Sequence, residues 1–398
     1  MDDTRASVRL KPKVDAAKFR HGFPWVYADE LVLDRRTKGI APGTLAVLED
    51  NNRMPLGLVS VNTASKLVAR VLDRDPAAVI DADWVRAKLT AALALRTSLY
   101  DAPFYRLIHA EADGMPGVVI DRFGDTAVFQ PNAVWADTLK DVIASALRDV
   151  VGVTNVVMNG MGRTRSTEGL SEERVALVGD LPDAPLPVTM NGATYLADVQ
   201  GGQKTGLFFD QRDNHAFAAQ FADGARMLDV FSHVGGFGLA ALAHGATHVT
   251  CVDASQAALD LAVQGAHATK PDVPFTPIQS DAFKYLEAAG ENGDRFDVVV
   301  CDPPAFAPGR SALGQGLRAY ERAAQLSARL VEPGGILVLC SCSHAATLDK
   351  FRSACLRGIG RAGRTGQLLH TGAAGADHPA HLSLADGGYL KALVFRLH

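Results

Sequence analysis

The sequence predicts an α/β protein whose C-terminal half is a Rossmann-like domain, preceded by a small β-barrel and a small central α+β domain. At 398 residues the chain exceeds the size at which a single hydrophobic core usually stops growing. Short alternating strand patterns occupy the first 72 residues, and strands alternate with helices from Arg226 onward. We therefore expect three domains, at residues 1–75, 76–185 and 186–398.

The composition is typical of a globular protein. Hydrophobic residues make up 47% and charged residues 21%, and no run of about eighteen apolar residues predicts a membrane span. The acidic N-terminus fits neither a secretory signal nor a transit peptide, so we expect a soluble, cytoplasmic protein. Five cysteines without a Cys-x-x-Cys pair predict neither a disulfide framework nor a zinc site, and no metal is expected.

The first domain combines strand patterns with cations and aromatic residues. Strands are expected at Thr44–Leu48, Gly57–Val61 and Leu67–Leu72. Residues 1–75 carry 13 Lys and Arg against 10 Asp and Glu, a local +3 in a chain of net charge -4. Between Lys11 and Tyr27 the cations interleave with aromatics, which suits phosphate neutralisation and base stacking. The sequence leaves open whether these aromatics, Phe23, Trp25 and Tyr27, bind RNA or fill the barrel's own core.

The central region alternates helical and strand patterns. Helices are expected at Asp81–Leu99 and Trp135–Val150, and strands at Tyr105–His109, Gly117–Asp121 and Thr154–Met158. Prolines 182, 185 and 187 mark a break, and a hairpin follows across Val188–Val199 with Asn191-Gly192 at its turn.

The C-terminal half predicts a parallel sheet with helices on both faces. The expected strands are Met227–Phe231, His248–Val252, Phe296–Cys301, Gly335–Cys340 and Tyr389–Phe395. The expected helices include Ser255–Thr269 and Leu317–Val331, with a Pro333-Gly334-Gly335 turn after the second.

A cofactor site is predicted where the first strand of this half ends. Asp229 lies inside the strand, a glycine turn opens the next helix, and Asp253 follows 24 positions later at the end of the second strand. This arrangement is typical of adenosine-containing cofactors, whose ribose diol binds such a carboxylate. Gly236-x-Gly238-x-x-Ala241 also fits a nicotinamide dehydrogenase. Against that alternative, the glycines begin four residues after Phe231 and no hydride-transfer constellation follows.

Two further segments predict the chemistry. Ser280-Asp281-Ala282-Phe283 offers an acid and a backbone amide for an adenine edge, and Asp302-Pro303-Pro304-Ala305-Phe306 forms a stiff loop after a strand. We expect Pro304 and Phe306 to wall a flat slot in which Asp302 binds the polar edge of a base. The alternative is a rigid surface turn with a buried Phe.

Cys342 is the cysteine best placed to act as a nucleophile. It follows the strand that ends near Cys340, whereas Cys251, Cys301 and Cys355 are expected to be inert and buried. Carbon 5 of a pyrimidine reacts only after a nucleophile adds to carbon 6, and a thiolate suits that addition. The alternative is that Cys342 also packs as a small hydrophobe.

Together these motifs resemble the ribosomal RNA large subunit methyltransferase I family. The segments that carry the resemblance are residues 202–212, 231–237, 302–306, 341–343 and 377–379. The resemblance implies a PUA domain, a central α+β domain and a class I methyltransferase domain that uses S-adenosylmethionine and releases S-adenosylhomocysteine. It also implies C5 methylation of a cytosine in 23S rRNA or a large-subunit precursor, with Cys342 as the thiol of the family's Ser-Cys-Ser motif. His233-Val234 and Ala305 depart from the family's Tyr-Thr and Lys.

The predicted site divides by role. Cys342 and Asp302 are the expected catalytic residues, and the base is expected to contact Pro303, Pro304 and Phe306. The cofactor is expected to contact Phe209, Asp210, Arg212, Asp229, Phe231, Gly235, Gly236, Asp253, Asp281, Ala282, Phe283 and Asp302. For Asp210 and Arg212 the alternative is a surface ion pair.

Two rival functions stay open at this point. One is methylation of a guanine or an exocyclic amine, with Cys342 structural, since relatives that methylate guanine have Asn at its place. The other is an RNA-binding assembly factor that holds S-adenosylmethionine without catalysis. The modified nucleotide, the general base and the oligomeric state, with a homodimer as one option, are also open.

Overall fold

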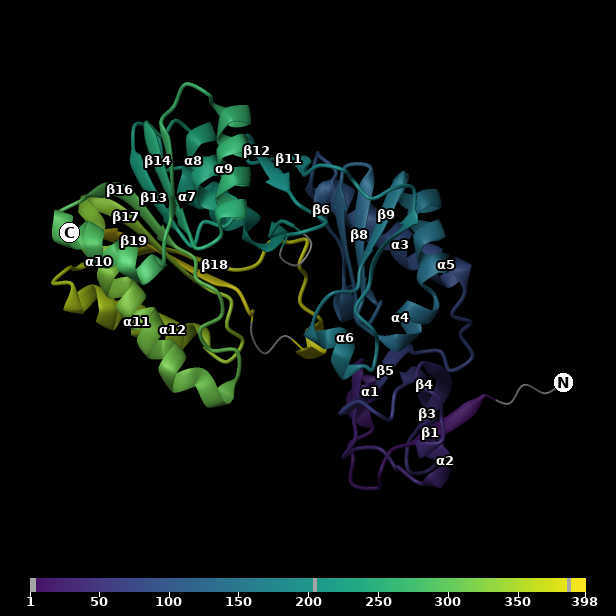
Figure 1. The fold of residues 1–398 in the computed structure, drawn as a ribbon. Helices are drawn as coiled ribbons and strands as arrows, with labels where there is room; N and C mark the ends of the chain where they lie inside the picture. The colour runs from purple at the N-terminus through teal and green to yellow at the C-terminus, as the bar shows by residue number, and fades with distance from the viewer. Residues whose placement is uncertain (1–4, 203–205, 385–387) are drawn as a thin grey trace. The chain divides into compact units, whose positions relative to one another are not determined.

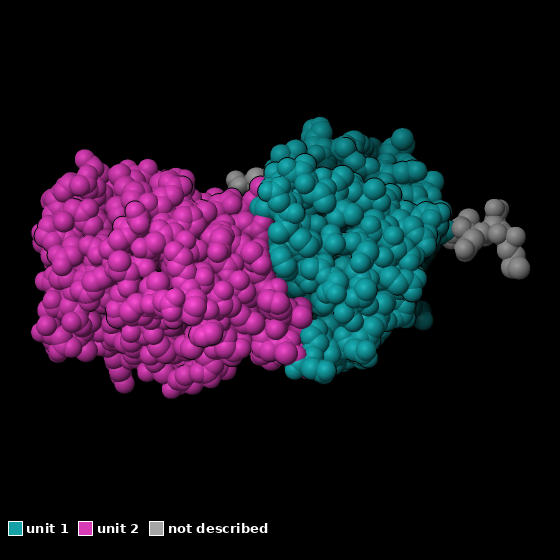
Figure 2. All heavy atoms as spheres, turned by 90° about the horizontal axis from the view of Figure 1, so that it is seen from above, with its two compact units in different colours: residues 1–183, 379–386 teal, residues 184–378, 387–398 magenta. Residues whose placement is uncertain are grey.

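The chain folds into two compact units, which Figure 2 colours separately: residues 1–183 with 379–386, and residues 184–378 with 387–398. The computed structural model describes residues 5–202, 206–384 and 388–398. Gln203, Lys204 and Thr205, which belong to the first family-like segment, lie outside the described residues. No helix within the described part is long and apolar enough to span a membrane.

The first unit begins with a five-stranded sheet in the order β1-β3-β4-β5-β2 (Figure 1). Its strands are β1 (Ala6–Arg9), β2 (Trp25–Tyr27), β3 (Thr44–Glu49), β4 (Pro55–Val61) and β5 (Leu67–Asp73), with short helices α1 (Ala17–Arg20) and α2 (Arg35–Lys38). The three aromatic residues of this region lie in different environments. Phe23 packs against the core, the Trp25 indole donates to Glu111 Oε1 at 2.9 Å, and Tyr27 is exposed.

The rest of the first unit is a second five-stranded sheet covered by helices. The sheet runs β10-β9-β8-β7-β6. Its strands are β6 (Phe104–His109), β7 (Val118–Phe123), β8 (Thr126–Pro131), β9 (Asn155–Asn159) and β10 (Arg174–Val178). The helices are α3 (Ala82–Leu99), η1 (Ala110–Asp113), α4 (Val134–Thr138), α5 (Lys140–Ala146), η2 (Leu147–Val151) and α6 (Arg163–Thr167).

The single helix predicted over Trp135–Val150 is wrong, because three short helical segments replace it. Trp135 is buried and its indole donates to Pro116 O at 2.8 Å. The chain breaks at Leu139, and α5 widens at its end into the π-helix η2, which ends at the left-handed Gly152. The apolar pattern is satisfied by this bent path as well as by a straight helix.

The second unit opens with the predicted hairpin. Strands β11 (Leu186–Met190) and β12 (Ala193–Ala197) pair in antiparallel register around Asn191-Gly192. Both turn residues have positive φ, 54° and 74°, as a two-residue type I′ turn requires.

A seven-stranded sheet forms the centre of the second unit, in the order β15-β14-β13-β16-β17-β19-β18. Its strands are β13 (Arg226–Val230), β14 (His248–Asp253), β15 (Phe275–Gln279), β16 (Phe296–Cys301), β17 (Val331–Ser341), β18 (Gly366–Gly372) and β19 (Lys391–Leu397). The helices are η3 (Phe209–Gln211), α7 (Arg212–Ala219), α8 (Gly236–Ala243), α9 (Gln256–Thr269), α10 (Ala282–Asn292), η4 (Arg310–Ala312), α11 (Leu313–Leu330) and α12 (Leu348–Arg361), with η5 (Leu382–Leu384) in the first unit.

The helices of this unit form two groups. α7 packs on α8 and α8 on α9, whereas α10 and α12 each pack on α11 (Figure 1). β13, β14 and β15 extend the sheet in one direction and β16 and β17 in the other. The chain therefore reverses its winding between β13 and β16, and ligands of doubly wound folds bind at the carboxyl ends of the strands beside such a reversal.

The sheet differs from the wholly parallel one that the sequence predicts, because β19 runs antiparallel to both β17 and β18. No crossover α-helix joins β18 to β19 among the described residues, and strands joined without a crossover return antiparallel. Pro333-Gly334-Gly335 also lies inside β17 at a register shift, not between helix and strand, and the preceding helix ends at Leu330.

Candidate active site

Parallel pairing brings the predicted motifs to one edge of the second unit's sheet. β13 ends at Val230, β14 at Asp253, β16 at Cys301 and β17 at Ser341. The loops that begin at Phe231, Asp302 and Cys342 therefore leave the sheet at its carboxyl edge. The Asp302 amide donates to Val230 O at 3.1 Å, which fixes the start of its loop beside β13.

The glycine turn has an unusual backbone. Phe231, His233 and Gly235 all have positive φ, at 63°, 49° and 83°. A Cβ on Gly236 would lie 2.7 Å from His215 Nε2, and one on Gly235 would lie 3.2 Å from the Cβ of Ala262. Backbone conformation and packing inside the protein therefore already require small residues at these two positions, before any ligand is considered.

Asp229 lies beneath this turn. It is 1% exposed, and its Oδ2 accepts the Gly238 amide at 2.9 Å, while its Oδ1 has no hydrogen-bond partner within the described part of the chain. Burial, together with the nearby Asp253 carboxylate, raises the pKa of Asp229 to about 7, although the hydrogen bonds from the Gly238 and Phe237 amides act in the opposite direction. A cationic ligand bound at the turn would therefore stabilise this carboxylate in its ionised form.

Asp253 is oriented by backbone amides. Its Oδ2 accepts the His233 amide and its Oδ1 the Ser255 amide, each at 2.8 Å, and the residue is partly exposed. A carboxylate accepts about four hydrogen bonds, so this group retains capacity for a ribose diol. Asp281 is exposed and caps α10 by accepting the Lys284 amide at 3.0 Å.

Three predicted site phenylalanines form one aromatic cluster. The ring centroids lie 6.4 Å apart for Phe231 and Phe283, 6.1 Å for Phe231 and Phe306, and 5.9 Å for Phe283 and Phe306. Phe306 also packs on Tyr320, with centroids 4.9 Å apart. Residues predicted for the cofactor and for the base thus share one apolar wall, next to buried Ala282 and Pro303 and exposed Pro304.

Asp302 is held by a residue for which the sequence analysis predicts no role. Gln211 donates from Nε2 to Asp302 Oδ2 at 2.9 Å, and its own Oε1 accepts Asn214 Nδ2 at 2.7 Å. Both amides are buried, and Asn214 also donates to Ala373 O at 3.1 Å. Gln211 lies within the family-like segment 202–212, but nothing in its local pattern points to Asp302, which is 91 residues away.

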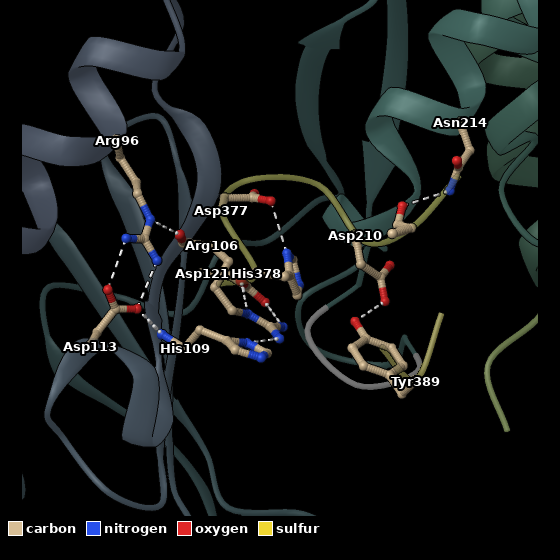
Figure 3. A network of polar contacts seen from close by, with 11 residues as sticks. Arg96, Arg106, His109, Asp113, Asp121, Asp210, Asn214, Asp377, His378 and Tyr389 are labelled. Carbon is tan, nitrogen blue, oxygen red and sulfur yellow. Dashed lines mark hydrogen bonds and ion pairs between the residues drawn. The ribbon is translucent and has the colours of Figure 1, made fainter. Parts of the chain in front are cut away.

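Asp210 and Arg212 are buried, so the alternative of a surface ion pair is wrong. Tyr389 donates its hydroxyl to Asp210 Oδ2 at 2.5 Å (Figure 3). The Gly375 amide donates to Asp210 O at 3.0 Å. The Arg212 guanidinium lies 5.5 Å from the ring centroid of Phe209, which is also buried. Figure 3 also shows the buried pair Asp377 and His378, which bonds at 2.8 Å.

Cys342 is half-buried, whereas Cys251, Cys301, Cys340 and Cys355 are all buried. Its Sγ lies 3.9 Å from Pro303 O, so the thiol meets the Asp302 loop. The flanking serines anchor the loop. Tyr320 bonds Ser343 Oγ at 2.7 Å and accepts from Ser341 Oγ at 2.9 Å, and the Ala307 amide donates to Ser343 Oγ at 3.0 Å.

A buried lysine lies beside this thiol. Lys391 Nζ donates to Ser343 O at 2.7 Å and to Ala346 O at 2.8 Å. Burial lowers the pKa of Lys391 to about 8, and negative charge on Cys342 opposes that shift. The ammonium therefore favours a thiolate at Cys342. The sequence did not single out Lys391, because a lysine at the start of a strand carries no signal of its burial.

The family of S-adenosylmethionine-dependent methyltransferases matches residues 175–396, and a PUA-like domain matches residues 8–74. A ribosomal RNA large subunit methyltransferase I from Aeromonas hydrophila is 37% identical over 338 residues, which span 84% of this chain and 85% of the relative. The protein of the same name from Cronobacter sakazakii is 34% identical over 392 residues, which span 97% and 98%.

Solved structures show the same fold. A protein described as a SAM-dependent methyltransferase from Streptococcus mutans superposes with a TM-score of 0.80 at 19% identity, over 98% of this chain and 100% of that one. A methyltransferase complexed with SAH superposes with a TM-score of 0.81, also at 19% identity, over 98% and 99%. The expected Rossmann-like fold, PUA-like domain and S-adenosylmethionine cofactor are thereby confirmed. The chain belongs to the ribosomal RNA large subunit methyltransferase I family.

Proposed function

We propose that the protein transfers the methyl group of S-adenosylmethionine to carbon 5 of a cytosine in 23S rRNA, with Cys342 as the nucleophile. The observation that carries the proposal is the meeting of two loops. The half-buried Cys342 thiol lies 3.9 Å from Pro303 O, beside an Asp302 carboxylate that Gln211 holds in place. Relatives that are named for rRNA methylation support the substrate class.

The chemistry requires a nucleophile that can add and leave. The Cys342 thiolate adds to carbon 6, which breaks the 5,6 double bond and places electron density on carbon 5. Bound S-adenosylmethionine supplies an electrophilic methyl group to that carbon. Transfer of the methyl group leaves S-adenosylhomocysteine. A base then accepts the carbon 5 proton, and the electrons of that bond restore the double bond as Cys342 leaves as a thiolate. Cysteine suits both steps because its thiolate is strongly nucleophilic and a good leaving group.

Asp302 and Phe306 orient the base. In this proposal Phe306 packs on a cytosine turned out of its stack, with Pro303 and Pro304 along the slot. Asp302 accepts a hydrogen bond from the exocyclic amine or, when protonated, donates one to the ring nitrogen and so stabilises the negative charge that develops as Cys342 adds. Gln211 is a positioning residue in this scheme, because its amide donates to Asp302 Oδ2 and so orients the carboxyl group.

Lys391 supports the thiolate. Its ammonium is held between Ser343 O and Ala346 O, in the loop that carries Cys342, so no reorganisation is needed to place the positive charge. A fixed charge in a buried site stabilises an anion more than a solvated one does.

The cofactor residues fit S-adenosylmethionine. Asp253 would accept hydrogen bonds from the two ribose hydroxyls. Asp281 and the Ala282 amide would face the polar edge of the adenine, and Phe283 and Phe231 would pack against the cofactor as apolar walls. The buried Asp229, with one oxygen unpartnered among the described residues, suits the positive charge that this cofactor brings. Gly235 and Gly236 shape the turn, and Phe209, Asp210 and Arg212 are proposed to close over the bound cofactor.

The test is transfer of labelled methyl from S-adenosylmethionine to 23S rRNA that lacks its own modifications, with the product nucleoside identified. We expect 5-methylcytidine from the wild type and from Cys355→Ala, which removes a cysteine away from the slot, but none from Cys342→Ala. RNA that contains 5-fluorocytidine should remain covalently attached to the wild type, because fluorine cannot leave as a proton does.

Each rival predicts a different product. Label on guanine or on an exocyclic amine, or full activity of Cys342→Ala, would exclude the thiol mechanism. RNA binding without any methyl transfer would favour the assembly factor. S-adenosylhomocysteine binding by every variant verifies that the second unit is folded.

A further inference from the structure

A cleft of about 400 Å³ lies on the second unit among α10, α11 and α12. Four of its eight lining side chains are arginines: Arg318, Arg322 and Arg329 from α11, and Arg361 from α12. The proposed reaction uses none of them. Leu326 is the one apolar residue among the eight, so the cleft is built for a polar or charged ligand.

The arginines of α11 form a stripe. Arg318, Arg322, Gln325 and Arg329 are spaced at i, i+4, i+7 and i+11, which places them on one face of the helix. At 1.5 Å per residue the stripe is about 16 Å long. α11 follows the Asp302 loop and connects β16 to the parallel strand β17, so it returns the chain from the carboxyl edge of the sheet to the amino edge. The stripe therefore extends from the catalytic edge toward the opposite edge of the sheet.

The charge of this surface opposes that of the whole chain. α11 and α12 together carry seven cations and two carboxylates, a net +5, in a chain of net -4. Buried Glu321 bonds Arg357 at 2.9 Å and Arg361 at 2.6 Å, and Glu287 bonds Arg322 at 2.5 Å. Within the described residues, Arg318 and Arg329 form no salt bridge, and both are exposed.

We propose that this cleft binds the phosphate backbone of the RNA substrate outside the catalytic slot. The inference rests on the proposed function, which supplies a polyanionic substrate. An arginine guanidinium can donate two parallel hydrogen bonds to the oxygens of one phosphate. A row of such cations about 16 Å long spans several successive phosphates of an RNA strand. The Arg322 guanidinium also lies 5.0 Å from the ring centroid of Phe283, so the row passes beside the aromatic cluster of the active site.

The test is the salt dependence of RNA binding by full-length Arg318→Glu/Arg329→Glu. The loss of two phosphate contacts should lower the slope of log K against log salt by about 1.4 to 1.8 and weaken binding about tenfold or more near physiological salt. Affinity for S-adenosylhomocysteine and kcat at saturating RNA should stay at the wild-type values, while KM for RNA rises.

The matched control is Lys270→Glu/Arg295→Glu, which makes the same charge change on exposed side chains at the amino edge of the sheet. Equal loss of affinity in the control, or an unchanged slope in the test variant, would overturn the proposal. Unchanged RNA binding together with lost self-association would overturn it in favour of a protein interface. RNA binding is measured without turnover, so the two proposals can fail separately. If the wild type binds RNA through these arginines but yields no 5-methylcytidine, the phosphate-binding cleft is supported and the proposed reaction is refuted.

Discussion

Replacement of Asp229 by asparagine should make the stability of the second unit less dependent on pH. The folded pKa of about 7 exceeds the ordinary value of 3.8 by roughly three pH decades. Each decade corresponds to about 1.4 kcal/mol, so ionisation of this carboxylate costs the folded state about 4 kcal/mol without cofactor. The folded protein binds the proton more tightly than the unfolded chain does. This contribution to the free energy of unfolding is therefore largest below pH 4 and lost as pH rises from about 4 to 7.

Asparagine keeps an oxygen for the Gly238 amide and cannot ionise. Its NH₂ group would lie where Oδ1 has no partner, which costs about 1–3 kcal/mol at every pH. We therefore expect the variant to be less stable than the wild type at pH 4.5. Between pH 4.5 and pH 8 its free energy of unfolding should rise relative to the wild type by about 3 kcal/mol.

The assay is urea unfolding of the cofactor-free protein at several pH values, followed by far-UV circular dichroism. Trp25, Trp84 and Trp135 all lie in the first unit, so tryptophan fluorescence identifies that unit's transition separately. Asp260→Asn, at an exposed helix position, is the matched control. Parallel pH profiles for Asp229→Asn and the wild type would refute the argument that Asp229 ionises at a cost.

Three other substitutions test single contacts. Gln211→Leu should lower kcat by about 10- to 100-fold, because a hydrogen bond to a charged group contributes about 1.5–3 kcal/mol; a change in turnover no larger than that of exposed Gln256→Leu would contradict the positioning role. Lys391→Met should shift the pH profile of Cys342 alkylation by iodoacetamide to higher pH, since it removes the adjacent ammonium; an unshifted midpoint would show that this charge does not act on the thiol. Gly238→Ala should destabilise the second unit by about 1–3 kcal/mol, because the added Cβ would lie 2.8 Å from Cys251 Sγ and 2.9 Å from Val249 Cγ1. The control is Gly290→Ala in α10, whose Cβ would meet nothing within 4 Å, so that this variant should be slightly more stable than the wild type. Equal effects of the two alanines in urea unfolding would argue against close packing at Gly238.

Local patterns in the sequence were sufficient to predict many of the helices and strands of this protein and the positions of its motif residues. Strand and helix periods from Arg226 onward predicted most elements of the methyltransferase domain, and Asn191-Gly192 predicted the hairpin turn. The motif residues could also be found, because parallel strands bring their carboxyl ends to one edge and site residues follow those ends. Phe231, Phe283 and Phe306 meet as a consequence.

Only the tertiary structure decided which partners hold these residues. Gln211 meets Asp302 across 91 positions and Lys391 reaches Ser343 across 48, and neither pairing leaves a periodic signal. The break of the helix at Leu139 and the antiparallel course of β19 likewise depend on what each segment packs against. The sequence by itself therefore determined which residues line the strand ends, because that depends on local periodicity. The orientation and ionisation of those residues depend on burial and long-range hydrogen bonds, which exist only once the chain has folded.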